Sequence, residues 1–396
     1  MQGDAARIAL PLAITFAIQM LTALAVFCAP VMAPVAAPAM GVAPSAIGYF
    51  ITASYLGAMI GTSFAGGTVA RLGPIRVSQL GLALCLAGLA CSAIGIAALV
   101  LLGAFIVGLG YGPSTPTSSV ILARAAPPRM LAMTFSIKQT GVPVGAALAG
   151  ALVPAMVLTV GWQGAALAIG FACLALAFAI SPQRARFDAD RDPSAPISVR
   201  AAFGPVKLVA TTRRLRETAV TGFVFGGAQV ALLAYLVTFL TESLGMSLVL
   251  AGLVLSVSQI ASVAGRIGWG VAADRLLPQR AMLGMLGLGM GASCVAALAV
   301  SPEWPRWLLF AYAAVFGATA LGWNGVWLAE LARQAPPGKV GEATGGSLFF
   351  TFLGVLLTPL VFNAVLALAG SYAIAYAAMG VPSLAVGARL LLWRRA

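Results

Sequence analysis

The chain has 396 residues, of which 61% are hydrophobic and 8% charged, with 45 glycines and a formal net charge of +13. This balance is typical of a helical protein that crosses a membrane several times, and it excludes one or two soluble domains. The charge does not indicate nucleic-acid binding, because the basic residues lie in short gaps between apolar runs and form no solvated patch.

No residue cluster in the sequence indicates an enzyme or a metal centre. The chain has no histidine, which removes the commonest proton shuttle and metal ligand and any Ser-His-Asp triad. It shows no clustered nucleophile, acid pair or phosphate-binding loop, so we expect no enzymatic activity, no cofactor and no bound metal. Five cysteines fall inside apolar segments without metal-ligand spacing, which favours packing thiols over disulfides. They are Cys28, Cys85, Cys91, Cys173 and Cys294.

Apolar runs long enough to cross about 30 Å of hydrocarbon occur six times on either side of a polar stretch at 182–216. We therefore predict an all-α integral membrane protein with twelve transmembrane helices. They form two pseudo-symmetric six-helix bundles, residues 1–181 and 217–396, joined by a linker at 182–216. The first run is longer than the apolar core of a signal peptide, so we expect it to remain in the protein. The runs lie at 8–34, 45–69, 76–97, 99–123, 131–157, 163–181, 217–241, 247–271, 281–300, 306–331, 343–367 and 371–392.

Lysine and arginine residues indicate on which side of the membrane each gap lies. Of the 23 basic residues, 20 fall in alternate gaps, which the positive-inside rule assigns to the cytoplasm. We therefore predict that both termini and the linker face the cytoplasm, in the inner membrane of a bacterial-type cell, and that the protein is monomeric. Prolines among aspartates predict a partly disordered linker, with a short amphipathic piece near 199–213.

The two halves of the sequence are related by an internal repeat. Glycines and basic turns recur at a nearly constant spacing, which predicts a parallel repeat of six helices. A shift of 204 residues lays Gly41, Gly48, Gly66 and Arg71 over Gly245, Gly252, Gly270 and Arg275, and a shift of 209 lays Arg124 and 126–128 over Arg333 and 335–337.

Two short segments at matching positions of the repeat resemble a known signature. The major facilitator superfamily carries G-x-x-x-D-R-x-G-R between its second and third helices, at the cytoplasmic gate. This chain is similar over essentially its whole length, with Ala70 in place of the signature's aspartate and Ala104 in place of a fourth-helix arginine. The resemblance implies the twelve-helix facilitator fold and a gate at Gly66, Arg71, Gly73, Arg76, Gly270, Asp274 and Arg275.

Within that superfamily the sequence is most similar to carboxylate carriers of the monocarboxylate and oxalate/formate type. Those carriers place a substrate-binding arginine four residues before a glycine in the eighth helix, as Arg266 and Gly270 stand here, and share the fifth-helix pattern found at 141–145. The chain departs from them at Ser262, where monocarboxylate carriers have an aspartate, and by lacking an eleventh-helix lysine. The resemblance implies a small organic anion, of the carboxylate class, as substrate.

Two cations lie inside predicted membrane helices. Lys138 and Arg266 each stand about eight residues from the cytoplasmic end of a helix, at a common depth of roughly 12 Å. Intramembrane charges are usually functional, and the resemblance would place both on the wall of a central cavity. The alternative is that Lys138 extends to the interface and that Arg266 donates to helix-end carbonyls. Gln259 and Ser262 share a helical stripe with Arg266.

Further polar and aromatic residues near mid-span complete the candidate substrate site. In the family they lie on helices that line the cavity, and two tryptophans spaced by four share a face that could cap a small anion. Packing in the core with internal hydrogen bonds is the alternative for each. They are Gln19, Thr22, Tyr111, Gln139, Gln229, Trp323, Asn324 and Trp327.

The sequence thus predicts a secondary active transporter that works by alternating access, with a small anion and the lipid bilayer as its partners. All ten acidic residues fall in the tail, in the linker or near helix ends, so anion exchange or facilitated anion movement is favoured. A proton would then travel on the substrate or on Lys138. The alternatives are a proton-coupled drug or metabolite exporter and, from another class, a membrane enzyme or nutrient sensor on a carrier scaffold.

Overall fold

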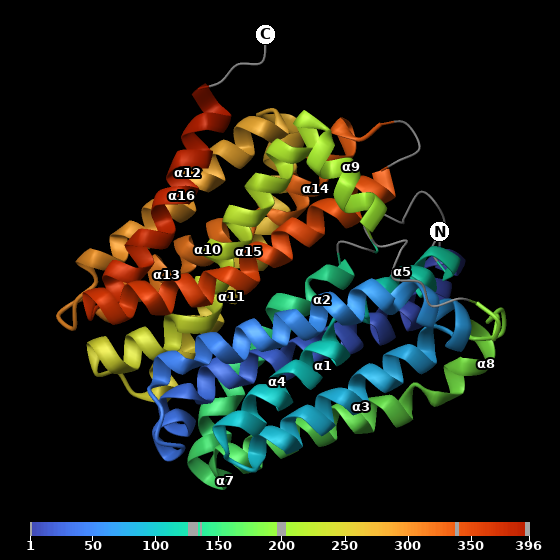
Figure 1. Ribbon diagram of the computed structural model, residues 1–396, viewed down its shortest axis with the longest axis horizontal. Helices are drawn as coiled ribbons and strands as arrows, with labels where there is room; N and C mark the ends of the chain where they lie inside the picture. The colour runs from blue at the N-terminus through green and yellow to red at the C-terminus, as the bar shows by residue number, and fades with distance from the viewer. Residues whose placement is uncertain (1, 126–133, 135–136, 196–202, 337–339, 393–396) are drawn as a thin grey trace. The chain divides into compact units, whose positions relative to one another are not determined.

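The computed structural model describes residues 2–125, 134, 137–195, 203–336 and 340–392. Within these ranges the chain is built from helices and contains no strand, as the sequence predicts (Figure 1). The helices fall into two compact units. One comprises Met1–Ala43 and Ala53–Val199, and the other comprises Pro44–Thr52 and Arg200–Ala396.

In the first unit, α1 packs along α7, and α3 packs against α4 and α7. Because lipid tails are as apolar as these side chains, close van der Waals contact favours this packing, and small residues let the helices approach closely. The elements are α1 (Gln2–Ala39), α2 (Ile47–Leu72, whose first turns belong to the second unit), α3 (Pro74–Ala93), α4 (Ala97–Tyr111), α5 (Ser114–Ala125), α7 (Gly141–Ala179), η3 (Ser181–Gln183) and α8 (Arg184–Phe187).

In the second unit, α10 packs along α15, α12 along α16, and α11 along α13. Helix α10 is the most enclosed of the predicted spans, with 83% of its apolar window buried. The elements are η1 (Pro44–Ala46), α9 (Phe203–Thr211), α10 (Arg213–Leu244), α11 (Leu248–Arg275), α12 (Gln279–Ala296), η5 (Ala297–Ala299), α13 (Arg306–Ala320), α14 (Asn324–Gln334), α15 (Val340–Ala369) and α16 (Tyr372–Leu392).

Eleven helical segments in the described ranges are long and apolar enough to cross a membrane. One of them, Ile137–Phe187, is 51 residues long and contains Gly161 at φ 74° and ψ 167°. That backbone conformation is essentially restricted to glycine and breaks the helix into two crossings. The segment therefore accounts for the fifth and sixth predicted spans, which brings the total to the twelve that the sequence predicts.

The boundaries of individual helices follow the internal repeat. Helix α4 begins at Ala97 and ends at Tyr111, and 209 residues later α13 begins at Arg306 and ends at Ala320. After a short break each continues as a second helix, α5 or α14. A Cβ added at Gly108 of α4 would lie 1.9 Å from the Ser54 carbonyl oxygen, and one at Gly317 of α13 would lie 2.0 Å from that of Ser258. In both units a glycine of the broken helix therefore packs directly against the backbone of the neighbouring helix.

The first part of the predicted linker is bound to the first unit. Asp188 is buried, and its carboxylate accepts hydrogen bonds from the backbone N–H groups of Ile75 (2.8 Å) and Arg76 (3.1 Å). It thereby caps the N-terminus of α3, whose first N–H groups have no partner within the helix. Burial raises the pKa of the Asp188 carboxyl, against the two backbone donors and the nearby Arg76 and Arg184. Residues 182–195 are therefore more ordered than the sequence indicates. Within the predicted amphipathic piece near 199–213, the structure describes a helix, α9.

Candidate functional site

Lys138 lies in the interior of the first unit, with 1% of its surface exposed. Its amine donates to Gln19 Oε1 at 2.7 Å, to Thr115 Oγ1 at 3.3 Å and to Gln139 Oε1 at 3.3 Å. The three acceptors come from α1, from α5 and from the residue next to Lys138, and none of them is charged. The structure thus places Lys138 in a polar cluster of the interior, whereas a lysine that extends to the interface would be exposed at its amine.

Gln19 Oε1 is the centre of this cluster, which we call the Lys138 cluster. In addition to the lysine amine, it accepts from the hydroxyls of Ser114 and Thr115, each at 3.3 Å. Both hydroxyls stand directly after the break between α4 and α5, where the chain turns at Pro113. The Lys138 cluster therefore depends on the broken fourth span, which aims the start of α5 at α1.

No carboxylate among the described side chains pairs with Lys138. The ion pairs found in the described part of the chain all involve Glu217 in the second unit. The acids of the first unit whose side chains the structure describes are Asp188, Asp190 and Asp192, which follow α8 outside the membrane spans. A buried cation surrounded by neutral oxygens keeps an unbalanced charge, which is costly unless an anion joins it or the amine gives up its proton.

In the second unit, Arg266 is partly buried on α11 and points at the break between α13 and α14. Its Nε donates to the backbone carbonyl of Leu321 at 3.1 Å. That carbonyl is available because the helix stops at Ala320 and resumes at Asn324. The side-chain amide of Asn324 donates to the same oxygen at 3.4 Å. One donor of the guanidinium thus satisfies a helix-end carbonyl, which is the alternative role that the sequence left open.

The repeat supplies a direct counterpart of this contact in the first unit. Thr62 lies 204 residues before Arg266, and Gly112 lies 209 residues before Leu321. The Thr62 hydroxyl donates to the Gly112 carbonyl at 3.0 Å. The same bond, from the second helix of each unit to the break in the fourth, is therefore made by a hydroxyl in one unit and by a guanidinium in the other.

The remaining polar candidates of the second unit bond mainly to one another or to their own helix. Gln229 accepts from Asn324 at 3.3 Å, which joins α10 to α14. Gln259 is 2% exposed and donates to Ser258, and Ser262 is fully buried and donates to the Gln259 carbonyl. Gln259 and Ser262 are thus interior residues with short-range partners. In the first unit Thr22 is buried in the same way and donates to Ile18 and Gln19 carbonyls of α1.

The two tryptophans are packed in the interior of the second unit, at 0% and 1% exposure. Trp323 and Trp327 meet edge to face with ring centroids 5.6 Å apart, and Trp323 meets Phe225 in the same way. The Trp327 indole donates to the Thr218 carbonyl at 2.8 Å, whereas the Trp323 indole nitrogen has no hydrogen-bond partner among the described residues. The polar edge of Trp323 is therefore the part of the pair that could still receive an acceptor.

Tyr111 ends α4, and its ring meets that of Tyr55 edge to face at 6.4 Å. The predicted gate residues of the first unit lie at the turn from α2 to α3. Arg71 is exposed, and Gly73 adopts φ 92° with its Cα packed against the Asp188 carboxyl, so that an added Cβ would lie 2.4 Å from it. In the second unit Gly270 and Arg275 lie on α11, while the side chain of Asp274, like the surroundings of Gly66, is outside the described part of the structure.

Sequence reasoning missed four residues that the structure brings into these clusters. Thr62, Ser114 and Thr115 are hydroxyl residues in apolar helices, where hydroxyls are too common to stand out; the repeat register would have marked Thr62 as the partner of Arg266. Glu330 was expected near a helix end, and it does lie in α14, but it is 9% exposed and accepts a hydrogen bond from Gln334.

Comparison with known proteins gives a consistent result. The sequence profile of the Major Facilitator Superfamily matches residues 15–359. Among solved structures, the chain is similar to the nucleoside transporter NupG, with 14% identity and a TM-score of 0.79 over 97% of this chain and 99% of that one. It is similar to a D-xylose-proton symporter, with 16% identity and a TM-score of 0.73 over 98% of both chains. It is also similar to the transporter FucP in the outward conformation, with 18% identity and a TM-score of 0.64 over 98% and 100%. A search of curated proteins found no match.

Proposed function

Since this chain belongs to the Major Facilitator Superfamily and is therefore a membrane transporter and not an enzyme, we propose that its substrate is a small organic anion of the carboxylate class. Transport would proceed by alternating access, with Lys138 and Arg266 each contributing a positive charge to substrate binding. We also propose that both termini face the cytoplasm of a bacterial-type cell, because the basic gaps alternate along the sequence.

The observation that carries this proposal is the environment of Lys138. The amine is 1% exposed and its three partners are neutral oxygens. Holding an ammonium group there without a counter-charge costs several kcal/mol, whereas a carboxylate that enters the Lys138 cluster would supply the missing charge. The neutral oxygens would keep the amine in place while the site is empty, and each could release its bond when the substrate binds.

Arg266 adds a second argument, drawn from the repeat. A hydroxyl suffices for its bond to the helix break, as Thr62 shows in the first unit. A guanidinium carries five N–H donors in a planar fork that matches a carboxylate, so its charge exceeds what the bond to Leu321 requires. We propose that this excess serves the substrate.

The same charges bear on coupling. With Lys138 buried and no carboxylate bonded to it among the described side chains, an empty carrier would reorient at a cost in desolvation, which a bound anion lowers. We therefore propose anion exchange or facilitated anion movement, with any proton carried by the substrate or by Lys138. Glu330, the one buried acid among the described residues of the second unit, is the site to test against this proposal.

A neutral, hydroxyl-rich solute is the second candidate. Four amide side chains take part in these polar contacts, and amides bind hydroxyl groups well. They are Gln19, Gln139, Gln229 and Asn324. The solved structures of similar fold include a nucleoside transporter and a D-xylose symporter by name.

Counterflow separates the two candidates. Purified protein in proteoliposomes without a pH gradient is loaded with unlabelled lactate, oxalate, formate, xylose or uridine, and uptake of the labelled compound is measured. We expect uptake accelerated by the internal anion and no effect of the two neutral compounds. Acceleration only by xylose or uridine would replace the anion by the neutral solute. Uptake that needs an inward proton gradient and is lost in Glu330→Gln would make the protein a proton symporter.

A further inference from the structure

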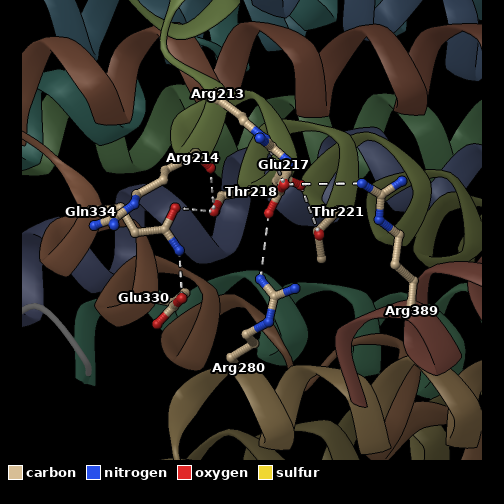
Figure 2. A network of polar contacts seen from close by, with 9 residues as sticks. All are labelled: Arg213, Arg214, Glu217, Thr218, Thr221, Arg280, Glu330, Gln334 and Arg389. Carbon is tan, nitrogen blue, oxygen red and sulfur yellow. Dashed lines mark hydrogen bonds and ion pairs between the residues drawn. The ribbon is translucent and has the colours of Figure 1, made fainter. Parts of the chain in front are cut away.

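Three arginines from three helices surround one carboxylate at one end of the second unit. Arg280 of α12 lies 3.5 Å from the Glu217 carboxylate, Arg213 of α10 lies 3.8 Å from it, and Arg389 of α16 lies 4.0 Å from it. Figure 2 shows the three guanidinium groups converging on Glu217 from different sides. We call this group the Glu217 cluster.

The Glu217 cluster is not neutral. Three guanidinium groups face one carboxylate, which leaves two positive charges, and one remains if the nearby Glu330 is counted as well. Glu330 and Arg280 line the same small cavity, and Glu330 accepts a hydrogen bond from the side-chain amide of Gln334 (Figure 2). The Nε of Arg280 is buried and has no hydrogen-bond partner among the described residues. Among the described side chains the cluster therefore carries excess positive charge.

The outer arginines are accessible at the level of the membrane surface. The side chains of Arg213 and Arg389 are 78% and 62% exposed. Helices α10 and α12 begin, and α16 ends, at this cluster, which marks it as one edge of the membrane-spanning part. Exposed apolar residues continue from it into the span along α16, where Val381, eight residues before Arg389, is 60% exposed. On α10, Val220, seven residues after Arg213, is 50% exposed, and the residues that follow it up to 241 are buried or half-buried.

We propose that the Glu217 cluster binds the phosphate of an anionic phospholipid, with the headgroup between Arg213 and Arg389 and an acyl chain along α16. A phosphodiester presents two anionic oxygens, and arginine binds such groups in a forked, charge-assisted geometry. Glu217 fixes the spacing of the guanidinium groups, and the lipid adds negative charge to a cluster that is positive among the described side chains. Basic pockets between membrane helices bind lipid headgroups in this way.

The choice of a lipid over free phosphate follows from the surroundings. A soluble phosphate would need only the charges, whereas the exposed face of α16 at Val381, together with Val220 near the start of α10, offers apolar contact that an acyl chain can use. The proposal concerns the second unit alone and does not depend on which substrate the transporter carries.

The test is lipid retention. The full-length protein is purified from nanodiscs made of phosphatidylcholine with one fifth phosphatidylglycerol, and the bound lipids are counted by native mass spectrometry. Wild-type protein should retain phosphatidylglycerol selectively. The double variant Arg213→Gln, Arg389→Gln should bind it about 30-fold more weakly, because each basic residue near an anionic surface contributes about 1 kcal/mol.

The matched control removes two charges elsewhere, from Lys207 on α9 and from Arg306 at the start of α13, both exposed. The Lys207→Gln, Arg306→Gln variant should retain the lipid as the wild type does, and gel filtration should show that all three proteins are folded. Equal retention by the Arg213/Arg389 variant, or equal loss in the control, would overturn the proposal. Inorganic phosphate at millimolar concentration tests the alternative ligand. If it displaces the lipid and also stabilises the detergent-solubilised protein as strongly as phosphatidylglycerol does, the site binds free phosphate and the assignment to a lipid is wrong.

Discussion

The two units break their fourth span at matching positions of the repeat. They place their cations at different positions of the repeat. In the second unit a guanidinium, Arg266, bonds the helix break that a hydroxyl, Thr62, bonds in the first. In the first unit an amine, Lys138, occupies a fifth helix whose counterpart 209 residues later carries Ser347, a fully buried serine. Each cation is thus replaced by a hydroxyl in the other unit.

This difference separates what the fold needs from what it does not. A hydroxyl satisfies the carbonyl at the break, and a serine is tolerated in the interior even though its hydroxyl has no partner among the described residues. The scaffold can therefore be built without either charge at these positions. A buried or partly buried charge costs free energy, and this supports our proposal that the two cations serve ligand binding.

The strongest test of the comparison replaces Arg266 by the residue of the other unit. Arg266→Thr supplies a hydroxyl to Leu321 and removes the fork, so we expect the protein to fold while anion transport at low substrate concentration falls on the order of 100-fold. Proteoliposome uptake and a thermal melt of the same preparation measure the two effects. Arg306→Gln, at an exposed site on α13, should transport normally. Uptake near the wild-type rate in Arg266→Thr would assign the guanidinium to the helix break alone.

The reciprocal change, Lys138→Ser, gives the first unit the residue found in the second. We expect the KM for the anion to rise about tenfold with little loss of stability, because the variant loses a charge at the substrate but also an uncompensated buried cation. Thr115→Val is the matched control, since it removes one neutral partner of the amine and keeps the charge. Its KM should change by less than about threefold. An unchanged KM in Lys138→Ser would exclude the amine from the substrate path.

The sequence predicted the spans and both cations because each produces a local signal. A run of apolar residues must cross the membrane, and a charge within it is conspicuous. Their partners could not be predicted in this way. Gln19 lies 119 residues before Lys138, and Ile75 lies 113 residues before Asp188. Such contacts depend on which helices are neighbours in the fold. A glutamine, serine or threonine in the sequence does not indicate which helix it will contact.

Two matched glycines test whether the units share their packing. An alanine at Gly108 or Gly317 would place a methyl group within about 2 Å of a backbone carbonyl oxygen, at Ser54 or Ser258. A side chain could relieve such a contact by changing rotamer, but a helix backbone cannot, so α4 or α13 must move. We therefore expect each variant to lose about 2 kcal/mol of stability. Thermal melts in detergent measure the loss. Gly268→Ala has open space around the new methyl group and should be neutral. A loss in only one of the pair would show that the two packings are not equivalent.

The units also differ at the start of their third helices. Asp188 caps α3, whereas α12 begins after Pro278 without a side-chain hydrogen bond to its cap. We expect Asp188→Ala to cost about 1 kcal/mol of stability, and Asp188→Asn to cost less because its amide oxygen still accepts one of the two bonds. The exposed neighbour Asp190 serves as control, and Asp190→Asn should melt with the wild type. Equal melting of Asp188→Ala and wild type would mean that the bonds at α3 contribute nothing to stability.

The smallest effect concerns pH and the charge of the same carboxyl. Burial raises the pKa of Asp188 above its ordinary value of 3.8, so the folded protein holds this proton at pH values where the unfolded chain has released it. In that window the folded state binds more protons than the unfolded state, and the stability that Asp188 contributes declines as the pH rises. The melting temperature of the wild type relative to Asp188→Asn should therefore be highest near pH 3.5. This difference should shrink as the pH rises above the ordinary pKa of 3.8, and it should stay constant once the carboxyl of the folded protein has ionised. A difference that grows with pH over this range would show that the two backbone donors, with Arg76 and Arg184, stabilise the carboxylate by more than burial penalises it.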